Sequence, residues 1–303
     1  MSIEVKNVFK YYGEQAALND VSFKINSGEI VGFLGPNGAG KSTMMKIITC
    51  YIPKSSGEVK VCGLDVDEES IEVRKKVGYL PEHNPLYLDM YVKEYLDFVA
   101  SIYKIPNKKE RIAEMIKLVG LQKEQRKKIG ALSKGYRQRV GLAQAIIHDP
   151  EVLILDEPTS GLDPNQLVDI RKLILDIGKT KTVMLSTHIM QEVEAICDRV
   201  IIIKEGQLVA DAEAKEIQKE ASKEEQTVLV EFDKETTRSQ LNKIDGINNV
   251  REVAENKWLL STNQTEDIRP VISKFAQDNG LLVLTMNKEE KSMEEVFKEL
   301  TKE

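Results

Sequence analysis

Residues 30–43 read IVGFLGPNGAGKST, in which a five-residue apolar run precedes nine residues that fit the pattern G-x-x-x-x-G-K-[ST]. Random residue usage would produce the bare pattern in roughly one chain in a hundred of this size, and a strand before it and a helix after it make chance less frequent still. Glycines let backbone N–H groups wrap around phosphate groups, and a helix that begins near Lys41 points its positive end at them. Lys41 adds a charge beside the β and γ phosphates, and the hydroxyl of Ser42 can bind Mg²⁺. The predicted phosphate-binding residues are Gly35, Pro36, Asn37, Gly38, Ala39, Gly40, Lys41, Ser42 and Thr43.

A second stretch, VLILDE at residues 152–157, has four apolar residues followed by two adjacent carboxylates. Charges at the end of a buried strand are costly unless they bind something. Asp156 is therefore predicted to bind Mg²⁺ directly or through water, and Glu157 to polarise the water that attacks a γ phosphate. Together the two stretches predict a nucleotide site of the P-loop type. P-loop proteins include kinases and GTPases, so these two stretches leave the nucleotide and the reaction open.

Short apolar runs alternate with amphipathic stretches along the first two thirds of the chain. Several runs are apolar at every position, as the strands of a parallel sheet covered by helices on both faces require. Strands are predicted at residues 21–25, 30–34, 77–80, 152–155, 182–186 and 200–203, and helices at residues 92–102, 111–119, 137–147, 165–177 and 190–196. This alternation of strand and helix predicts an α/β fold.

The composition changes after Leu208, because residues 211–226 read DAEAKEIQKEASKEEQ and offer almost nothing to bury. We interpret this segment as a helical linker that contains a domain boundary. It separates a nucleotide-binding domain at residues 1–217 from a second domain at residues 218–303, for which we expect a regulatory or accessory role. The predicted order strand, helix, strand, strand, helix, strand in the second domain resembles a split βαβ, ferredoxin-like α+β unit, and a last helix begins at Met293.

The charge balance restricts the partners of the chain. Its 303 residues include 43 Lys and Arg against 49 Asp and Glu, a formal net charge of −6, which excludes a strongly basic nucleic-acid-binding protein. No apolar run approaches the roughly 18 residues of a membrane span, and the first ten residues lack the apolar core of a signal peptide. We therefore expect a soluble, cytoplasmic chain. Cys50, Cys62 and Cys197 have no metal-binding or C-x-x-C spacing and are expected to be reduced thiols.

Three further motifs point to a family. Residues 132–139 read LSKGYRQR, residues 160–163 read SGLD, and a predicted strand ends just before His188. With the two stretches above, this ordered set resembles the ATP-binding subunits of ABC transporters, and the resemblance covers about residues 1–215. It implies a P-loop NTPase fold of the ABC ATPase type, ATPase activity, and ATP and Mg²⁺ as ligands.

In that family the loop usually written L-S-G-G-Q covers a nucleotide held by a partner subunit. The resemblance therefore implies a homodimer in which Ser133 and Gly135 contact the nucleotide. Ser133 is also a plausible N-cap of the helix that follows, whose free N–H groups can face a γ phosphate. Lys134 and Tyr136 replace a glycine and the glutamine of the usual loop, and a first-turn lysine opposes the helix dipole by roughly 0.3–1 kcal/mol unless an anion lies opposite. Asp163, in SGLD, resembles the residue that links the two nucleotide sites of the dimer.

The resemblance also assigns residues around the base and the γ phosphate. Tyr12, before Gly13, matches the aromatic residue under the adenine ring, with Tyr11 as the alternative, and His188 matches the histidine that contacts the γ phosphate. Glu82 stands where the family commonly carries glutamine, in a loop that touches Mg²⁺ and reports to the membrane subunit. A carboxylate can still ligate Mg²⁺, but it adds a charge and lacks an N–H donor. The predicted metal ligands are thus Ser42, Glu82 and Asp156, and the predicted catalytic residues are Glu157 and His188.

The rest of the pattern, including an extension that ends with SMEEVF at residues 292–297, looks like the exporter branch that works with separately encoded permeases. Within this branch, GYLPEHNPLY at residues 78–87 and the extension resemble the ATP-binding subunit associated with bacterial gliding motility. The resemblance implies an integral membrane permease as partner and a peripheral location at the inner face of the cell membrane.

The main alternative is a soluble ABC ATPase that acts on nucleic acid or ribosomes. Such proteins usually carry two fused ATPase units, a long coiled-coil insertion or a basic arm. This sequence has one phosphate-binding pattern and an acidic balance, so no nucleic-acid partner is expected. A nucleotide-binding regulator without turnover is a third interpretation, but it would leave Glu157 and His188 without a purpose. The transported substance is not predicted, because an ATP-binding subunit need not contact it.

Overall fold

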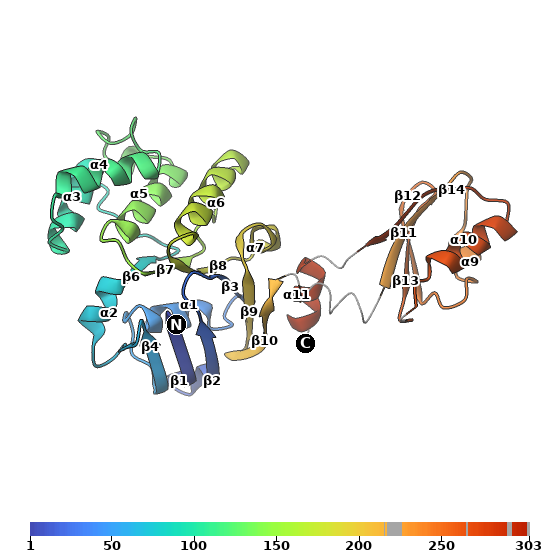
Figure 1. Cartoon of the computed structure of the whole chain (residues 1–303), viewed down its shortest axis with the longest axis horizontal. Helices are drawn as coiled ribbons and strands as arrows, with labels where there is room; N and C mark the ends of the chain where they lie inside the picture. The colour runs from blue at the N-terminus through green and yellow to red at the C-terminus, as the bar shows by residue number, and fades with distance from the viewer. Residues whose placement is uncertain (215, 217–225, 265, 290–292, 302–303) are drawn as a thin grey trace. The chain divides into compact units, whose positions relative to one another are not determined.

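The computed structural model describes residues 1–214, 216, 226–264, 266–289 and 293–301. The chain divides into two compact units, Met1–Glu213 and Ala214–Glu303, which are described separately (Figure 1). The predicted boundary after residue 217 and most of the predicted linker lie outside the described residues. The first residues of that linker, 211–213, instead belong to strand β10, where they pair with β9.

A six-stranded sheet forms the centre of unit 1, in the order β10-β9-β3-β8-β7-β6. Its strands are β3 (Ile30–Leu34), β6 (Val77–Leu80), β7 (Val152–Asp156), β8 (Thr182–Ser186), β9 (Arg199–Lys204) and β10 (Gln207–Glu213). Five of them run parallel, and β10 is an antiparallel edge strand. Every residue of β3, β7 and β8 is buried, which explains why these segments are apolar at almost every position. The predicted α/β class is confirmed.

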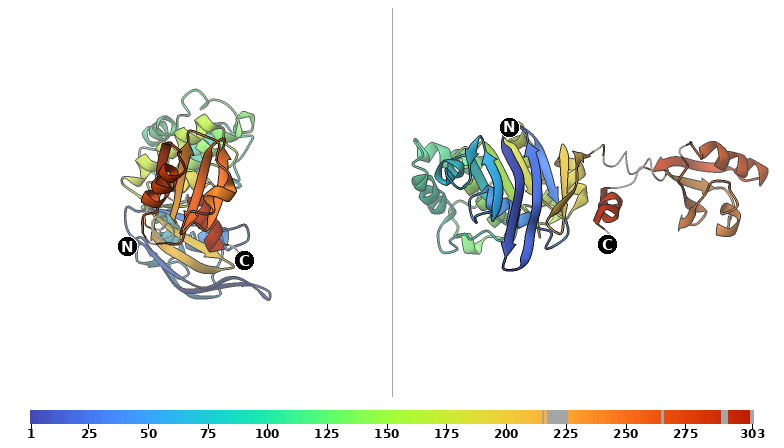
Figure 2. Two further views of the ribbon diagram at one scale, coloured as in Figure 1. Left: turned by 90° about the vertical axis from the view of Figure 1, so that its right-hand side faces the viewer. Right: turned by 90° about the horizontal axis from the view of Figure 1, so that it is seen from below.

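Unit 1 has a second, antiparallel sheet that the sequence patterns did not predict. Its order is β2-β1-β4-β5, and its strands are β1 (Ile3–Tyr12), β2 (Gln15–Ile25), β4 (Ser56–Val61) and β5 (Leu64–Asp65). Figure 2 shows the long strands β1 and β2 side by side. The strand predicted at residues 21–25 is only the end of β2. Three register shifts between β1 and β2 interrupt the alternation of apolar and polar residues, so the pattern typical of a strand is lost in β1.

The helices of unit 1 mostly follow the predicted periodicity. They are α1 (Lys41–Ile48), α2 (Ser70–Lys76), α3 (Val92–Ile102), α4 (Lys108–Leu118), α5 (Lys134–Ile146), α6 (Pro164–Gly178) and α7 (Met190–Ile196). Ser133 is the N-cap of α5, as predicted, and its hydroxyl accepts a hydrogen bond from the Tyr136 N–H at 3.4 Å. The helix therefore begins at Lys134, three residues before the apolar periodicity that starts at residue 137. Asp163 caps α6, where its carboxylate accepts hydrogen bonds from the Asn165 and Gln166 N–H groups at 3.1 and 3.0 Å.

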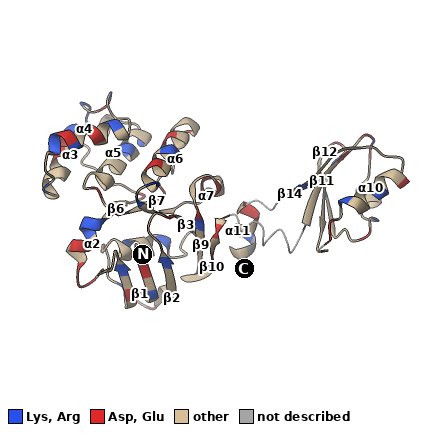
Figure 3. Cartoon of the chain, viewed as in Figure 1, with Lys and Arg blue, Asp and Glu red and all other residues tan. Residues whose placement is uncertain are grey.

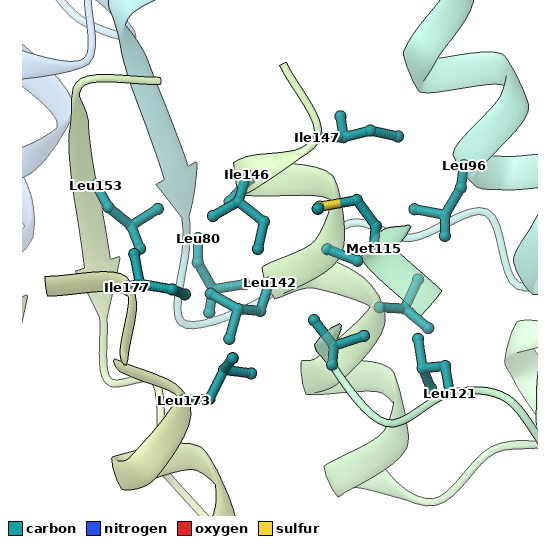
Figure 4. Packing of buried hydrophobic residues seen from close by; sticks show 14 of the residues in the cluster. Leu80, Leu96, Met115, Leu121, Leu142, Ile146, Ile147, Leu153, Leu173 and Ile177 are labelled. Atoms are coloured by element: carbon teal, nitrogen blue, oxygen red, sulfur yellow. The ribbon is translucent and has the colours of Figure 1, made fainter. Parts of the chain in front are cut away.

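Two apolar cores lie on opposite faces of the parallel sheet. Along β7, Leu153 and Leu155 enter one core, whereas Val152 and Ile154 enter the other, because successive side chains of a strand point to opposite faces. The first core gathers α3 to α6, and Figure 4 shows α5 placing Leu142 into it between β7 and the neighbouring helices. The second core joins α1 to the antiparallel sheet. Both cores therefore fix the parallel strands, and with them the segments that follow each strand.

Unit 2 contains a four-stranded antiparallel sheet in the order β12-β13-β11-β14. Its elements are β11 (Gln226–Phe232), α9 (Arg238–Leu241), β12 (Asn249–Ala254), β13 (Lys257–Thr262), α10 (Arg269–Asp278), β14 (Val283–Glu289) and α11 (Met293–Thr301). Alternate residues of β11 and β13, among them Phe232, Trp258 and Leu260, are buried with Ile272 of α10 in a core of this unit's own residues.

Charges of both signs are spread over both units. In Figure 3, lysine and arginine residues are interspersed with aspartate and glutamate along the helices and strands. Among the described residues, none of the helices combines the length and the apolar character that crossing a membrane requires.

Candidate nucleotide site

The candidate site lies where four neighbouring strands of the parallel sheet end. The glycine-rich loop follows β3, His188 follows β8, Asp156 and Glu157 stand at the end of β7, and Glu82 follows β6. Because β3, β8, β7 and β6 are adjacent and parallel, their carboxyl ends meet at one edge of the sheet. A pocket of about 480 Å³ opens there, lined by Gln15, Ala17, Asn37, Gly38, Gly40, Lys41, Ser42, Thr43, Glu82, Asp156, Glu157, Ser160 and His188.

The loop before α1 is shaped by glycine. Gly40 has φ of 108°, and a Cβ atom there would lie 2.6 Å from the Ala17 carbonyl oxygen and 2.8 Å from the Leu18 side chain, so no other residue fits. The loop is held by a hydrogen bond from the Ala39 N–H to the Pro36 carbonyl at 3.1 Å. Gly40 also leaves the start of α1 without a side-chain cap. The first N–H groups of α1 are therefore available to an anion in the pocket.

Lys41 is the first residue of α1 and is only 9% exposed. Its ammonium donates hydrogen bonds to the carbonyls of Gly35 and Pro36 at 2.7 and 3.1 Å. Burial lowers the pKa of Lys41, and the negative charges of Glu157, Asp156 and Glu82 oppose that effect. The carboxylates thus favour the ammonium form, the form that binds a phosphate.

Ser186, the last residue of β8, ties the end of β7 to its own strand. Its hydroxyl donates a hydrogen bond to Asp156 at 2.6 Å and accepts one from the backbone N–H of Glu157 at 3.0 Å. Glu157 has φ of 50°, an uncommon conformation for a residue other than glycine. The chain therefore turns sharply between Asp156 and Glu157, so that both line the pocket.

Glu157 and His188 form a pair at the mouth of the pocket. Nδ1 of His188 lies 2.8 Å from Oε2 of Glu157, and the side chains are 63% and 13% exposed. Burial raises the pKa of Glu157, while the hydrogen bond and charge of His188 and the charge of Lys41 lower it. A carboxylate with a raised pKa beside an imidazole is suited to accept a proton from water.

The oxygen donors of the pocket fit a magnesium ion that is shared with a nucleotide. Ser42, Glu82 and Asp156 line the same pocket, and no cluster of three or more His, Cys, Asp or Glu side chains that could hold a metal occurs in the part of the chain that the structure describes. Mg²⁺ is usually bound by one or two carboxylates together with phosphate oxygens and water. This donor set is therefore suited to Mg²⁺ on a phosphate and not to a dedicated protein cage.

Seven predicted site residues do not line this pocket: Tyr12, Gly35, Pro36, Ala39, Ser133, Gly135 and Asp163. Gly35, Pro36 and Ala39 belong to the glycine-rich loop itself, where the Gly35 and Pro36 carbonyls accept hydrogen bonds from Lys41. Tyr12 ends β1, is 52% exposed, and has the Lys10 ammonium 5.1 Å from its ring centre. Ser133 and Asp163 are N-caps, and the first turns of their helices touch, because the side chain of Gln166 covers Gly135.

Some residues of the pocket were missed by sequence reasoning. Gln15, Ala17 and Ser160 line it, and Ser186 orients its carboxylates. The signal for Ser186 was its place at the end of a buried strand, level with Asp156 in the next strand.

Residues 242–245 read NKID and fit the N-K-x-D pattern of guanine recognition. Ile244 of that segment is buried in the core of unit 2, however, and none of these four residues lines the pocket.

Comparison with known proteins identifies the family. The model of the ABC transporter family matches residues 18–160. The "Uncharacterized ABC transporter ATP-binding protein YxlF" of Bacillus subtilis (strain 168) is 36% identical over 72% of this chain and 73% of its own length. The "Nod factor export ATP-binding protein I" of Burkholderia orbicola (strain AU 1054) is 35% identical over 69% of this chain and 70% of its own length.

A solved structure supports the same assignment. The dimeric structure of a post-hydrolysis state of the ATP-binding cassette MJ0796, bound to ADP and Pi, has a TM-score of 0.65 and 28% identity, and the match covers 70% of this chain and 98% of that one. Members of the family bind ATP, form dimers and work with membrane permeases. The chain therefore belongs to the ATP-binding subunits of ABC transporters, and it is an ATPase.

Proposed function

We propose that this chain powers export through a separate integral membrane permease. The observation that carries the proposal is the pocket in which Lys41, Asp156 and the Glu157–His188 pair come together. Export is supported by the likeness to the Nod factor export ATP-binding protein I. In this proposal the subunit lies peripherally at the inner face of the cell membrane.

ATP is the substrate, with its β and γ phosphates against the glycine-rich loop and the first turn of α1. Lys41 exchanges its hydrogen bonds with the Gly35 and Pro36 carbonyls for bonds to phosphate oxygens. Ser42, Glu82 and Asp156 hold Mg²⁺, which when bound neutralises negative charge on the phosphates. Tyr12, with Tyr11 as the alternative, lies under the adenine ring.

Glu157 is the group that receives a proton from the attacking water. His188 holds the Glu157 carboxylate at 2.8 Å and contacts the γ phosphate. Ser186 fixes the backbone of Glu157 and the carboxylate of Asp156, so the base and the metal ligand keep a constant separation.

The residues outside the pocket act on a second nucleotide. In the proposed head-to-tail homodimer, Ser133 and Gly135 of one subunit cover the nucleotide held by the other, and Asp163 links the two sites. This proposal is supported by the exposure of Ser133, Lys134 and Tyr136 at the start of α5, and by the dimeric state of the MJ0796 cassette. Gly135 is buried beneath the Gln166 side chain, which has to move aside for Gly135 to contact a nucleotide.

The permease would contact a second pocket of unit 1. This pocket, of about 530 Å³, shares Ser42, Glu82 and Asp156 with the nucleotide pocket, and its aromatic lining includes Tyr51, which is 72% exposed. Glu82 therefore lies between a nucleotide and a docked permease segment, a position suited to transmit the presence of the metal.

Unit 2 is proposed to be a ferredoxin-like regulatory or dimer-stabilising domain, with the boundary near residue 217. The strand order β12-β13-β11-β14 and the separate cores of the two units support this. Truncation after Glu216 is expected to leave a folded chain that still binds ATP, and an insoluble product would mean that the units share a core.

The narrower resemblance to a gliding-motility subunit stays a prediction. A polytopic permease gene and motility genes next to this gene would support it.

The central test is Glu157→Gln in the full chain. The variant is expected to bind MgATP normally, to hydrolyse it at least about a hundredfold more slowly because the base is lost, and to accumulate as a dimer in sedimentation experiments. Hydrolysis at the wild-type rate would contradict the role of Glu157. A monomer at saturating MgATP would contradict the proposed dimer.

Transport is tested separately. The chain is expected to co-purify with membranes through the permease, whereas co-purification with ribosomes or nucleic acid would favour the soluble ABC ATPase that is the main alternative.

A further inference from the structure

A carboxylate with no exposed surface lies behind the nucleotide pocket. Glu192, on α7, is 0% exposed. Its Oε2 atom accepts hydrogen bonds from the hydroxyls of Thr159 at 2.7 Å and Thr187 at 2.8 Å. Thr159 and Thr187 are themselves 1% and 0% exposed. A buried carboxylate is costly, so its presence here needs a reason.

The two threonines belong to the segments that carry the proposed catalytic pair. Thr159 comes two residues after Glu157, and Thr187 comes immediately before His188. Glu192 thus joins the segment after β7 to the segment after β8. The Thr187 hydroxyl also accepts a hydrogen bond from the Ile189 N–H at 3.1 Å, so the same network fixes the start of α7.

We infer that Glu192 is a positioning residue that sets the separation of Glu157 and His188. The inference rests on the proposed roles of that pair in hydrolysis. Ser186, at the end of β8, links the same two regions a second time, through Asp156 and the Glu157 N–H. With both links in place, the segments cannot move apart without breaking a buried hydrogen bond, so the 2.8 Å contact is held before ATP binds.

The chemistry of the network favours a carboxylate over an apolar side chain. An ionised carboxylate only accepts hydrogen bonds, so both hydroxyls must point their protons at it, and their orientation is fixed. The guanidinium of Arg171 lies 3.8 Å from Oε1 of Glu192 and compensates its charge. Oε1 and the Arg171 Nε atom have no hydrogen-bond partner within the described residues, so the hydroxyls are the closest polar contacts of Glu192.

Thr159→Val is the sharpest test, because it keeps the shape of a buried side chain and removes the one hydrogen bond that its hydroxyl makes within the described part of the chain. Thr159→Ser is the matched control that keeps the hydroxyl. In the full chain, Thr159→Val is expected to lower kcat for ATP about tenfold, with the KM for ATP close to wild type. The melting temperature should fall, because the buried carboxylate loses one of its two hydroxyl donors, but the protein should stay folded at the assay temperature. Thr159→Ser is expected to retain at least about half of the wild-type kcat.

The contrast between the two variants separates positioning from general destabilisation. A positioning defect lowers kcat while the KM for ATP stays near wild type, and the serine hydroxyl of Thr159→Ser restores most of the lost rate. General destabilisation instead lowers the amount of folded enzyme, so kcat is measured per folded molecule.

Three results would overturn the inference. They are a wild-type kcat in Thr159→Val, an equal loss in Thr159→Ser, and a loss of kcat that is matched by a loss of ATP affinity or of folded protein. Glu157→Gln is assayed in parallel: if it hydrolyses ATP at the wild-type rate, the proposed role of Glu157 fails first. That result is distinguishable from a failure of Glu192 alone.

Discussion

The first turns of α1 and α5 have similar chemistry and different surroundings. Each helix begins at a lysine, Lys41 in α1 and Lys134 in α5. Lys41 is buried and donates hydrogen bonds to two carbonyls of its own loop. Lys134 is exposed, and within the described part of the chain its ammonium makes neither a hydrogen bond nor an ion pair; it packs against Gly161.

The two helices also differ in whether a side chain caps their first N–H groups. Gly40 leaves the start of α1 open to a pocket that contains three carboxylates, whereas Ser133 caps α5 with its own hydroxyl. The start of α5 lines none of that pocket and packs against the start of α6. The residues proposed to bind the phosphates and the metal at the start of α1 thus all come from one chain. The α5 site can meet a phosphate only if a second molecule brings it, which is the reason to propose a dimer.

The largest expected effect distinguishes the two lysines. Lys41→Ala should weaken ATP binding at least about tenfold, because loss of a charge-assisted phosphate contact costs more than roughly 1.5 kcal/mol. Lys134→Ala should leave the affinity of the monomer within about twofold, because Lys134 lies outside the pocket. Calorimetric titration of the full chain with MgATP measures both. An affinity within threefold of wild type for Lys41→Ala would refute the phosphate-binding loop, and an equal loss in Lys134→Ala would remove the contrast between the helices.

The caps of α5 and α6 are expected to differ in strength. Asp163→Ala removes two hydrogen bonds, of 3.1 and 3.0 Å, and should lower the free energy of unfolding by about 1–2 kcal/mol. Ser133→Ala removes one longer bond, of 3.4 Å, and should cost only about 0.5 kcal/mol. Urea unfolding without nucleotide measures both values. A larger loss for Ser133→Ala would mean that Ser133 is built for the stability of α5 and not for a ligand.

The pocket could be predicted from the sequence, because its signals are local. The glycine pattern, the carboxylates after residue 155 and the histidine after residue 187 each follow a buried strand, and parallel strands bring their carboxyl ends together. The order of elements in unit 2 was also readable, since Asn256 marks the tight turn between two short strands.

What the sequence did not reveal depends on packing across long distances. Strand β1 contains register shifts that hide its alternation. In the sequence, Glu192 is indistinguishable from the glutamates that usually lie exposed on a helix. It is buried only because α7 packs against the segments after β7 and β8. The contact between Gly135 and Gln166 likewise joins two helix starts that are 31 residues apart, and neither residue type predicts it.

A smaller effect is expected on how the melting temperature depends on pH when Glu157 is replaced. Burial raises the pKa of Glu157 above its ordinary value of 4.5. The stability that this carboxyl contributes is fully present below the pKa of the unfolded state and is lost as the pH rises through the higher folded-state pKa. Glu157→Gln should therefore raise the melting temperature at pH 8, and the difference should vanish below about pH 4.

Glu151 provides a control, because its pKa is shifted in the opposite direction to that of Glu157. A hydrogen bond from Lys76 lowers the pKa of Glu151, so its contribution is present above the unfolded-state pKa and is lost as the pH falls. Glu151→Gln should slightly lower the melting temperature at pH 8. A decrease for both variants would show that the burial of Glu157 does not dominate its energetics.

The smallest expected effect comes from Glu82, which lines both the nucleotide pocket and the proposed permease pocket. Glu82→Gln restores the residue common in the family, keeps the size and removes one charge near the metal. Hydrolysis should survive, because Glu157 and His188 remain paired, but the Mg²⁺ concentration for half-maximal rate should rise roughly two- to fivefold as a carboxylate ligand is lost. Mg²⁺ and Mn²⁺ titrations of wild type, Glu82→Gln and the control Asp89→Asn, an exposed charge in the same segment, measure this shift. Superimposable curves for wild type and Glu82→Gln would mean that Glu82 does not approach the metal, and its role would then be confined to the surface offered to the permease.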